Sequence, residues 1–195
     1  LYDPEVAGGT NVSLDHKPLS ELQALFGGFC ARARRAVVVN LDCGASAALV
    51  DRQGTRVTFG VENGRADLSA CGIEADPDGV RFRVGEVAFR LRVPGRHNVS
   101  NALAAVAACG LLGVSTAASA VALAGFLGIK RRLQVVGRAG GVTVMDDFAH
   151  NPDKIAASLE TLKAFPGRLL VMFQPHGFGP TRFLMEGLIS AFSEG

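Results

Sequence analysis

The stretch of residues 141–153 constrains the fold of this chain more than any other. Its first five residues, Gly-Val-Thr-Val-Met, form an apolar run rich in β-branched side chains, which is typical of a buried strand. Asn151 and Pro152 then open a helical pattern, because a proline in the first helical turn costs no hydrogen bond. The sequence therefore predicts a strand that is followed directly by a helix.

Acidic and imidazole side chains fill the connection between this strand and this helix. Asp146, Asp147 and His150 lie at the carboxyl end of the predicted strand and face the start of the helix. Ligands of open α/β sheets bind in such a crevice, and backbone N–H groups at a helix start attract phosphate. An aspartate helix cap beside a surface histidine would explain the same residues without any ligand. The rest of the chain has to decide between the two.

Composition limits the classes of protein to consider. The chain has 48% hydrophobic and 19% charged residues, which fits a folded globular protein. Its net charge of +2 gives no reason to expect nucleic acid or a membrane as a partner. The four cysteines form no C-x-x-C pair, which is typical of reduced cysteines in a cytoplasmic protein. We therefore expect a cytoplasmic protein, and we interpret both ends of the chain as cuts within a longer one.

The order of predicted elements indicates an α/β protein with two units. Helices and strands alternate before residue 52, and short alternating strands between residues 56 and 94 favour a small antiparallel insertion. A strand–helix–strand unit is expected at residues 142–174. Glycine, lysine and arginine gather at residues 128–140, which we interpret as the linker. The resulting domains are residues 1–133 and 134–195.

Polar side chains also gather where other predicted elements begin or end. A Pro-Gly turn leads into a helix whose first turn carries His97, Asn98 and Asn101, and two amides beside a histidine suit a purine edge. Between two apolar segments lie Lys130, Arg131 and Arg132, and arginine fits a phosphate better than lysine does. A solvated basic face would explain the three cations equally simply.

The two remaining histidines lie in loops that follow predicted strands. His16 stands beside Asp15, as a metal ligand or a helix cap would, although Mg²⁺ prefers oxygen ligands. His176 lies in a glycine-rich loop between a strand predicted to end at residue 173 and a helix that carries Arg182. All four histidines of the chain are thus predicted at element ends, where ligands of α/β sheets bind.

Together these motifs resemble those of the Mur ligases, the ATP-dependent ligases that build the peptide of bacterial peptidoglycan. The resemblance covers nearly the whole chain. It is strongest to the branch that joins L-alanine to UDP-N-acetylmuramate and to its relative that reattaches recycled tripeptide. In the family's order the chain contains Thr10-Asn11-x-x-x-Asp15-His16, Gly95-x-His97-Asn98-x-x-Asn101-Ala102, Lys130-Arg131-Arg132 and Asp146-Asp147-Phe148-Ala149-His150-x-Pro152.

The resemblance implies a central ATP-binding domain with a mostly parallel sheet, followed by the start of a Rossmann-like C-terminal domain. The phosphate-binding loop G-x-x-G-K-[ST] would lie upstream of residue 1. In the family, ATP converts a carboxylate into an acyl phosphate, and an amine then forms the amide. The implied roles are Mg²⁺ binding for His16, adenine binding for His97, Asn98 and Asn101, contact with the γ-phosphate for Arg132, and the nucleotide face of the last domain for Asp147 and His150.

One departure leaves the amino acid or peptide substrate open. In the L-alanine branch, arginines after Phe-Gln-Pro-His would hold the carboxylate of the incoming amino acid, whereas Gly177 and Pro180 occupy those positions here. The loss of both arginines removes a bidentate carboxylate site. His176 and Arg182 remain as candidate substrate-binding residues.

Two alternatives to a Mur-type ligase of UDP-N-acetylmuramate stay open. The loop Asp15-His16-Lys17 is similar to that of cyanophycin-type ligases, which also use Mur-like domains. A nucleotide-binding module without ligase activity is the other alternative, and loss of the upstream phosphate loop would favour it. A Rossmann dehydrogenase is disfavoured, because no G-x-G-x-x-G follows a predicted strand.

Overall fold

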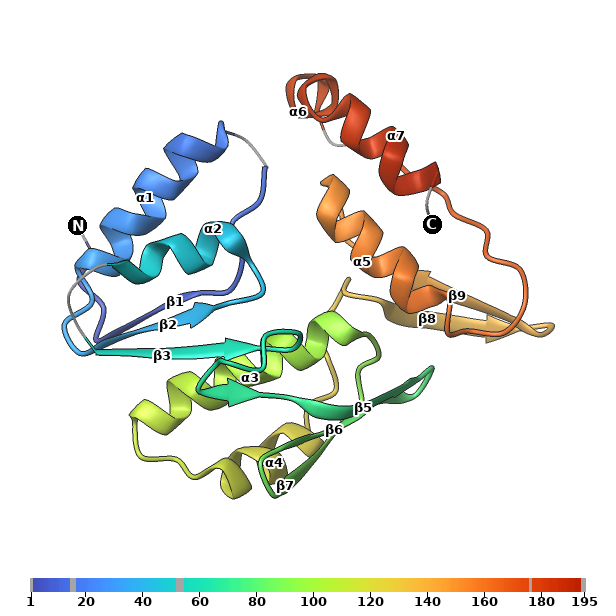
Figure 1. Cartoon of the computed structure of the whole chain (residues 1–195). Helices are drawn as coiled ribbons and strands as arrows, with labels where there is room; N and C mark the ends of the chain where they lie inside the picture. Colours follow the sequence, from blue (N-terminus) through green and yellow to red (C-terminus); the bar gives the residue numbers. More distant parts are fainter. Residues whose placement is uncertain (1, 15–16, 52–54, 176, 194–195) are drawn as a thin grey trace.

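A four-stranded parallel sheet organises the first part of the chain (Figure 1). The computed structural model describes residues 2–14, 17–51, 55–175 and 177–193. Parallel neighbours need crossover connections, and α1 connects β1 to β2 while the short α2 with its 3-10 turn η1 connects β2 to β3. The strands, in sheet order, are β1 (Val6–Gly9), β2 (Ala36–Asn40), β3 (Thr55–Gly60) and β4 (Leu68–Ser69); the connections are α1 (Leu19–Ala31), α2 (Gly44–Ala47) and η1 (Ala48–Asp51).

A three-stranded antiparallel sheet follows and shares a core with the parallel one. It consists of β5 (Cys71–Asp76), β6 (Gly79–Val84) and β7 (Val87–Leu91). Phe82 and Phe89 face each other across β6 and β7 with ring centroids 5.0 Å apart. The long helix α3 (Arg96–Leu111) buries Val99, Leu103 and Val106 in the same core as residues of both sheets, and α4 (Thr116–Ala124) packs on β7. The core therefore fixes α3 relative to the parallel sheet.

The last part of the chain is a hairpin and three helices. The hairpin pairs β8 (Gln134–Ala139) with β9 (Val142–Asp146), and α5 (Pro152–Leu162) packs beside α7 (Met185–Ser193) after the short α6 (Phe178–Phe183) (Figure 1). Ile155, Leu159, Leu184, Leu188 and Ala191 form the small core of this part. The predicted α/β class, with a mostly parallel sheet and an antiparallel insertion, is confirmed.

The segment predicted as a linker, residues 128–140, instead contains β8. Gly140 and Gly141 form the two-residue turn of the hairpin, with φ of +55° and +78°. Two successive positive φ values are the geometry of a tight hairpin, for which glycine is the favoured residue. Of the glycines that suggested a linker, Gly140 therefore marks a turn, and Gly137 lies within β8.

The prediction of a strand that ends at residue 173 is also wrong. Residues 168–175 pair with no described strand, and Leu170 and Met172 are 76% and 99% exposed. A strand exists only where a neighbour accepts its hydrogen bonds, and β8 and β9 pair with each other. Within the described residues, no helix is both long and apolar enough to span a bilayer.

Candidate functional site

The first turn of α3 contacts α5, and this contact brings the two parts of the chain together. His97 Nδ1 lies 3.4 Å from the hydroxyl oxygen of Thr161, which itself donates to the carbonyl oxygen of Ala157 at 2.8 Å. Gly95, just before α3, has φ +99°, and a Cβ there would lie 2.4 Å from the Thr161 hydroxyl. Only glycine allows this approach. The start of α3 is therefore anchored against the end of α5.

The two asparagines of α3 are linked to each other and differ in exposure. The side-chain N–H of Asn98 donates to the carbonyl oxygen of Pro94 at 2.7 Å, and Asn101 Nδ2 donates to Asn98 Oδ1 at 3.3 Å. Asn98 is half-buried, whereas Asn101 is exposed. Both ends of the Asn98 amide are thus engaged within the protein. Asn101 Oδ1 accepts no hydrogen bond from the described residues, so of the two amides it is the one with an exposed and unused acceptor.

His97 is a neutral imidazole near pH 7. Burial lowers the pKa of His97, and the negative charge of Asp147 opposes that shift without reversing it. A neutral imidazole can accept at one nitrogen and donate at the other. His97 therefore joins the α3–α5 contact without adding a positive charge to it.

Asp147 fixes the turn that carries the basic segment. Its Oδ2 accepts the backbone N–H of Leu133 at 2.7 Å, and its Oδ1 accepts the backbone N–H of Ala149 at 2.6 Å. The turn needs such support because Arg131 and Leu133 adopt φ of +60° and +45°. Left-handed backbone at residues other than glycine costs roughly 1–3 kcal/mol each. The Asp147 carboxylate thus sets the direction of Arg132.

The two arginines of this turn have different surroundings. The Cζ of Arg131 lies 4.7 Å from the centre of the Phe148 ring, and its Nε is 3.4 Å from Oδ2 of Asp146. The Cζ of Arg132 lies 6.0 Å from the same ring, and this exposed residue forms no ion pair with any residue that the structure describes. Arg131 is therefore engaged in the protein, whereas the charge of Arg132 is available to an anion.

His150 and Lys154 lie together at the start of α5. His150 Nδ1 is 2.9 Å from the carbonyl oxygen of Phe148, so its N–H donates there, and Nε2 is left to accept from Lys154 Nζ at 3.3 Å. Asn151 caps the helix by accepting the backbone N–H of Lys154 at 3.0 Å. The predicted helix start is confirmed, and a cation lies beside it.

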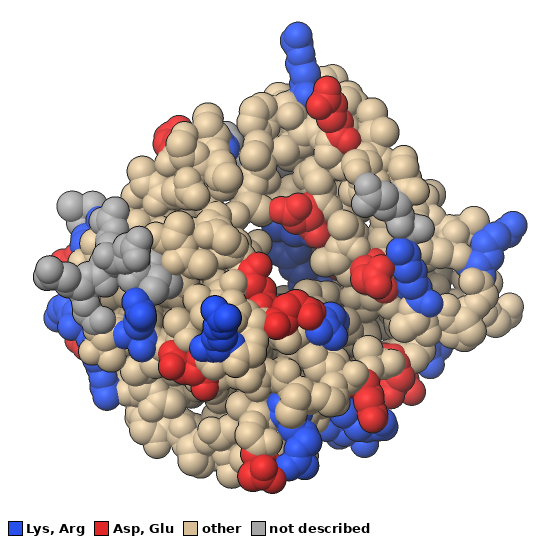
Figure 2. All heavy atoms as spheres, viewed as in Figure 1, with Lys and Arg blue, Asp and Glu red and all other residues tan. Residues whose placement is uncertain are grey.

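The face seen in Figure 2 is hollowed at its centre, and acidic and basic side chains gather around this hollow. In the same view it lies between α2 and α5 (Figure 1). Asn98 and Asn101 lie in the first two turns of α3, Arg132 lies in the turn held by Asp147, and Lys154 lies at the start of α5 beside His150. The arrangement offers amides for a heterocycle and cations for an anion, as a nucleotide requires.

Two family models match the chain. The model described as the Mur ligase middle domain matches residues 1–109, and the one described as the Mur ligase, glutamate ligase domain matches residues 131–195. This chain belongs to the Mur ligase family. The resemblance that the motifs predicted is therefore confirmed, while the division between residues 133 and 134 stays a prediction.

Similar proteins support the family assignment along the whole chain. This Mur ligase chain is 34% identical to the UDP-N-acetylmuramate–L-alanine ligase of Trichormus variabilis, over 98% of the chain and 42% of that protein. It is 39% identical to the protein of the same name in Streptomyces coelicolor, over 94% of the chain and 43% of that protein. The crystal structure of MurC from Thermotoga maritima matches with a TM-score of 0.77 and 27% identity, covering 98% of this chain and 44% of that one. The chain thus spans less than half the length of these relatives.

Other predicted site residues of this Mur ligase lie apart from the α3–α5 contact or outside the described residues. His16 and His176 fall outside them. Arg182 is exposed on α6, and no hydrogen bond or ion pair among the described residues joins it to Asp147 or His97. In the part of the chain that the structure describes, no three His, Cys, Asp or Glu side chains are grouped to hold a metal ion.

Sequence reasoning missed two residues of the site. Thr161 carries no motif, since a threonine near the end of a helix has no signature of its own, and only the tertiary contact shows its role. Lys154 could have been found, because residues four apart on a helix lie on one face and Lys154 is four after His150.

Proposed function

We propose that this chain is the nucleotide-binding part of an ADP-forming ligase that joins an amino acid or a peptide to a UDP-N-acetylmuramate-type carboxylate. The observation that carries the proposal is the contact of His97 with Thr161. It joins the part matched by the middle-domain model, which contains the amides of α3, to the part matched by the glutamate ligase domain model, which contains the basic turn held by Asp147. This supports a nucleotide site that both parts share. The relatives named as UDP-N-acetylmuramate–L-alanine ligases support the same reaction class.

The proposed reaction has two steps. A carboxylate oxygen of the acceptor attacks the γ-phosphorus of ATP, and the bond from that phosphorus to the ADP oxygen breaks. The amine of the second substrate then attacks the acyl carbon, loses a proton and expels phosphate. Such steps need positioning and charge stabilisation more than covalent help from the protein.

The residues divide this work according to their contacts. Asn101 would bind the adenine edge, with Asn98 orienting it through their 3.3 Å hydrogen bond. Arg132 would hold the γ-phosphate, because its guanidinium is exposed and a planar fork suits phosphate oxygens. Asp147 would act through the turn that it holds, and His150 would line the nucleotide face beside Lys154.

We propose that Mg²⁺ binds together with the ATP phosphates, beside the loop that carries His16. The base of this loop lies beside α3, since Asn40 Nδ2 donates to the carbonyl oxygen of Thr10 at 2.8 Å and lies 3.4 Å from the Ser100 hydroxyl of α3. The loop therefore starts next to the helix that would bind adenine. Magnesium takes few protein ligands and completes its shell with phosphate oxygens and water. When bound, the ion would neutralise phosphate charge.

The remaining assignments concern the substrates and the compartment. His176 and Arg182 would contact the incoming amino acid or peptide, and small molecules would be the only partners, with no nucleic acid or membrane involved. Cys30, Cys43, Cys71 and Cys109 form no disulfide among the described residues, which suits the reducing cytoplasm that we propose.

The test is a phosphate-release assay on the full-length protein with ATP, UDP-N-acetylmuramate and a panel of amino acids and short peptides. The proposal expects release that depends on both the acceptor and an amine substrate. Release that depends on an amino acid but not on the UDP sugar would favour a cyanophycin-type ligase instead. ATP binding without any acceptor-dependent release would leave only a nucleotide-binding module.

A further inference from the structure

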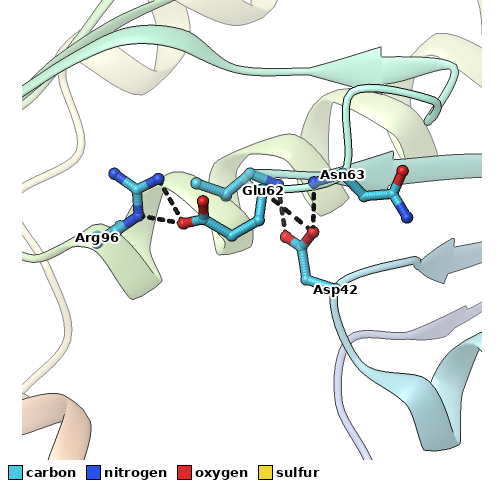
Figure 3. Close-up of polar contacts among 5 residues, drawn as sticks. Asp42, Glu62, Asn63 and Arg96 are labelled. Carbon is cyan, nitrogen blue, oxygen red and sulfur yellow. Dashed lines mark hydrogen bonds and ion pairs between the residues drawn. The ribbon is translucent and has the colours of Figure 1, made fainter.

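Asp42, just after β2, holds the loop that follows the neighbouring strand β3. Its carboxylate accepts three successive backbone N–H groups, from Val61 at 2.5 Å, Glu62 at 3.2 Å and Asn63 at 2.8 Å (Figure 3). A carboxylate with several backbone donors forms strong, charge-assisted hydrogen bonds. The beginning of this loop is therefore fixed by one side chain from the next strand.

The far end of the same loop is fixed as well. Oδ2 of Asp67 accepts both the backbone N–H of Thr58, at 2.8 Å, and its hydroxyl, at 2.6 Å. These hydrogen bonds, which favour the charged carboxylate, lower the pKa of Asp67. Because both ends of the loop are held, the backbone position of Glu62 is fixed.

Glu62 points at Arg96, the first residue of α3 (Figure 3). The Arg96 Nε lies 2.7 Å from Glu62 Oε1, and its Nη2 contacts the same oxygen. A cation at a helix start is unfavourable, and α3, which is described in full, has no acidic residue in its first turn and no side-chain cap. Glu62 supplies the missing negative charge from another part of the chain.

This ion pair acts on position more than on stability. The side chains of Arg96 and Glu62 are 51% and 70% exposed, and exposed pairs contribute little to folding. Arg96 is followed directly by His97 and Asn98, so a displacement of Arg96 moves both. The pair therefore bears on the placement of the residues that we assign to the nucleotide.

A second connection runs through Asn40, which is 7% exposed. Its Oδ1 accepts the backbone N–H of Asp42 at 2.9 Å, and its Nδ2 lies 3.4 Å from the hydroxyl of Ser100 in α3. Asp42 is thus connected to α3 in two ways. Its backbone is held by the buried Asn40, which contacts Ser100. Its carboxylate holds the exposed Glu62, which pairs with Arg96.

We propose that Asp42 is a positioning residue for nucleotide binding. By holding residues 61–63 it sets Glu62 against Arg96, and so it sets the first two turns of α3, where Asn98 and Asn101 lie. The inference rests on the proposed function, because it assigns these amides to ATP.

The experiment compares the full-length wild-type protein with Asp42→Ala and Asp42→Asn. The KM for ATP and kcat are measured in the phosphate-release assay, binding of a fluorescent ATP analogue is titrated, and thermal unfolding is followed. Asp42→Ala is expected to raise the KM and the analogue Kd about tenfold, which corresponds to about 1.4 kcal/mol of binding free energy, while kcat changes little. Asp42→Asn keeps one acceptor oxygen, so its KM and analogue Kd should lie between those of the wild-type protein and those of Asp42→Ala.

A charge exchange tests the route through the ion pair and leaves Asp42 in place. Glu62→Arg and Arg96→Glu should each raise the KM for ATP, and the double exchange should restore most of the affinity. The matched control is Arg83→Gln, which breaks a similarly exposed pair with Glu86 at the β6–β7 turn and should leave the KM unchanged. If Asp42→Ala lowers the unfolding temperature markedly, its KM no longer reports on positioning alone. The Glu62 and Arg96 exchange then decides whether the ion pair positions α3 for ATP.

The outcomes separate this inference from the proposed function. Wild-type protein that binds no ATP overturns the proposed function and this inference with it. Wild-type protein that binds ATP, together with an unchanged KM in Asp42→Ala, overturns this inference alone. Failure of the double exchange to restore affinity also overturns it, since Arg96 would then act by touching the nucleotide itself.

Discussion

The backbone N–H of Leu133 donates to Oδ2 of Asp147 at 2.7 Å and thereby closes the turn that carries Arg132. The same carboxylate accepts the N–H of Ala149, so one side chain ties the basic segment to the start of α5. The carbonyl oxygen of Arg131 accepts the N–H of Phe148 at 2.9 Å and completes the connection. Two motifs that the sequence shows as separate are therefore one structural unit.

This unit predicts different roles for Arg131 and Arg132. Arg132→Lys keeps the positive charge and loses the planar fork, so we expect kcat to fall about tenfold or more with little change in the KM for ATP. Arg131→Lys should change kcat much less, because Arg131 contacts Phe148 and Asp146 within the protein. Steady-state kinetics of both variants test this. Equal losses in the two would mean that the segment is a general basic patch.

The contacts of Asn98 and Asn101 predict that both residues affect ATP binding but that only one of them affects the stability of the fold. Asn101→Ala and Asn98→Ala should both raise the KM for ATP in the full-length protein. Only Asn98→Ala should also lower the free energy of unfolding, by about 0.5–1.5 kcal/mol, because Pro94 loses its donor. Kinetics and urea unfolding of both variants separate the effects. An unchanged KM in both would remove the adenine assignment.

The α3–α5 contact predicts a strong effect at Gly95. A Cβ there would lie 2.4 Å from the Thr161 hydroxyl, and φ is +99°, so Gly95→Ala should destabilise through both strain and collision. Gly113→Ala is the matched control, since its φ is +89° and nothing lies within 4 Å of the added Cβ. Strain alone applies there, at about 1–3 kcal/mol.

Thermal unfolding of the two alanine variants isolates the collision. Gly95→Ala should have the lower unfolding temperature, and Thr161→Ala in the same chain should recover part of the difference. Equal unfolding temperatures for the two alanine variants would show that α3 and α5 do not meet at this point in solution.

The sequence predicted the local features of this region better than its long-range contacts. The start of α5 at Asn151 and Pro152 followed from capping chemistry, which acts between neighbours in the chain. The β8 strand was missed because Gly137 within it and Gly140 just after it resemble the glycines of a linker, and pairing with β9 is what makes it a strand. The donors that Asp42 binds are backbone N–H groups, which leave no trace in a sequence. Their contact becomes visible only when β2 and β3 lie side by side.

Burial of His97 predicts a stability that depends on pH. Its pKa in the folded protein is lower than the ordinary value of about 6.5, so the unfolded chain binds more protons between the two values. The free energy of unfolding should therefore fall as the pH drops through 6.5 towards the folded pKa of His97, with no further loss from this group below it. His97→Gln should remove that part of the dependence. The prediction is wrong if the difference in free energy of unfolding between the wild-type protein and His97→Gln stays constant as the pH drops below 6.5.

The loop before α6 predicts that L-alanine is a poor substrate, although the relatives described above are named for it. Gly177 is the N-cap residue just before this helix, with φ +80°, and its carbonyl oxygen accepts the Thr181 hydroxyl at 2.6 Å. An arginine at residue 177 would have to adopt a left-handed backbone, so the loop is built for glycine. Without arginines at residues 177 and 180, a free α-carboxylate lacks its bidentate partner here.

We therefore expect a larger amine substrate, such as a short peptide, to give a higher kcat/KM than L-alanine with UDP-N-acetylmuramate as the acceptor. Arg182→Ala should lower kcat/KM for that substrate while the KM for ATP stays the same, because Arg182 lies on α6, away from the α3–α5 contact. Pro180→Arg is the informative companion, since it restores a cation without altering the backbone of Gly177. If the wild-type protein turns over L-alanine as well as any peptide in the panel, arginines elsewhere hold the carboxylate and the prediction is wrong.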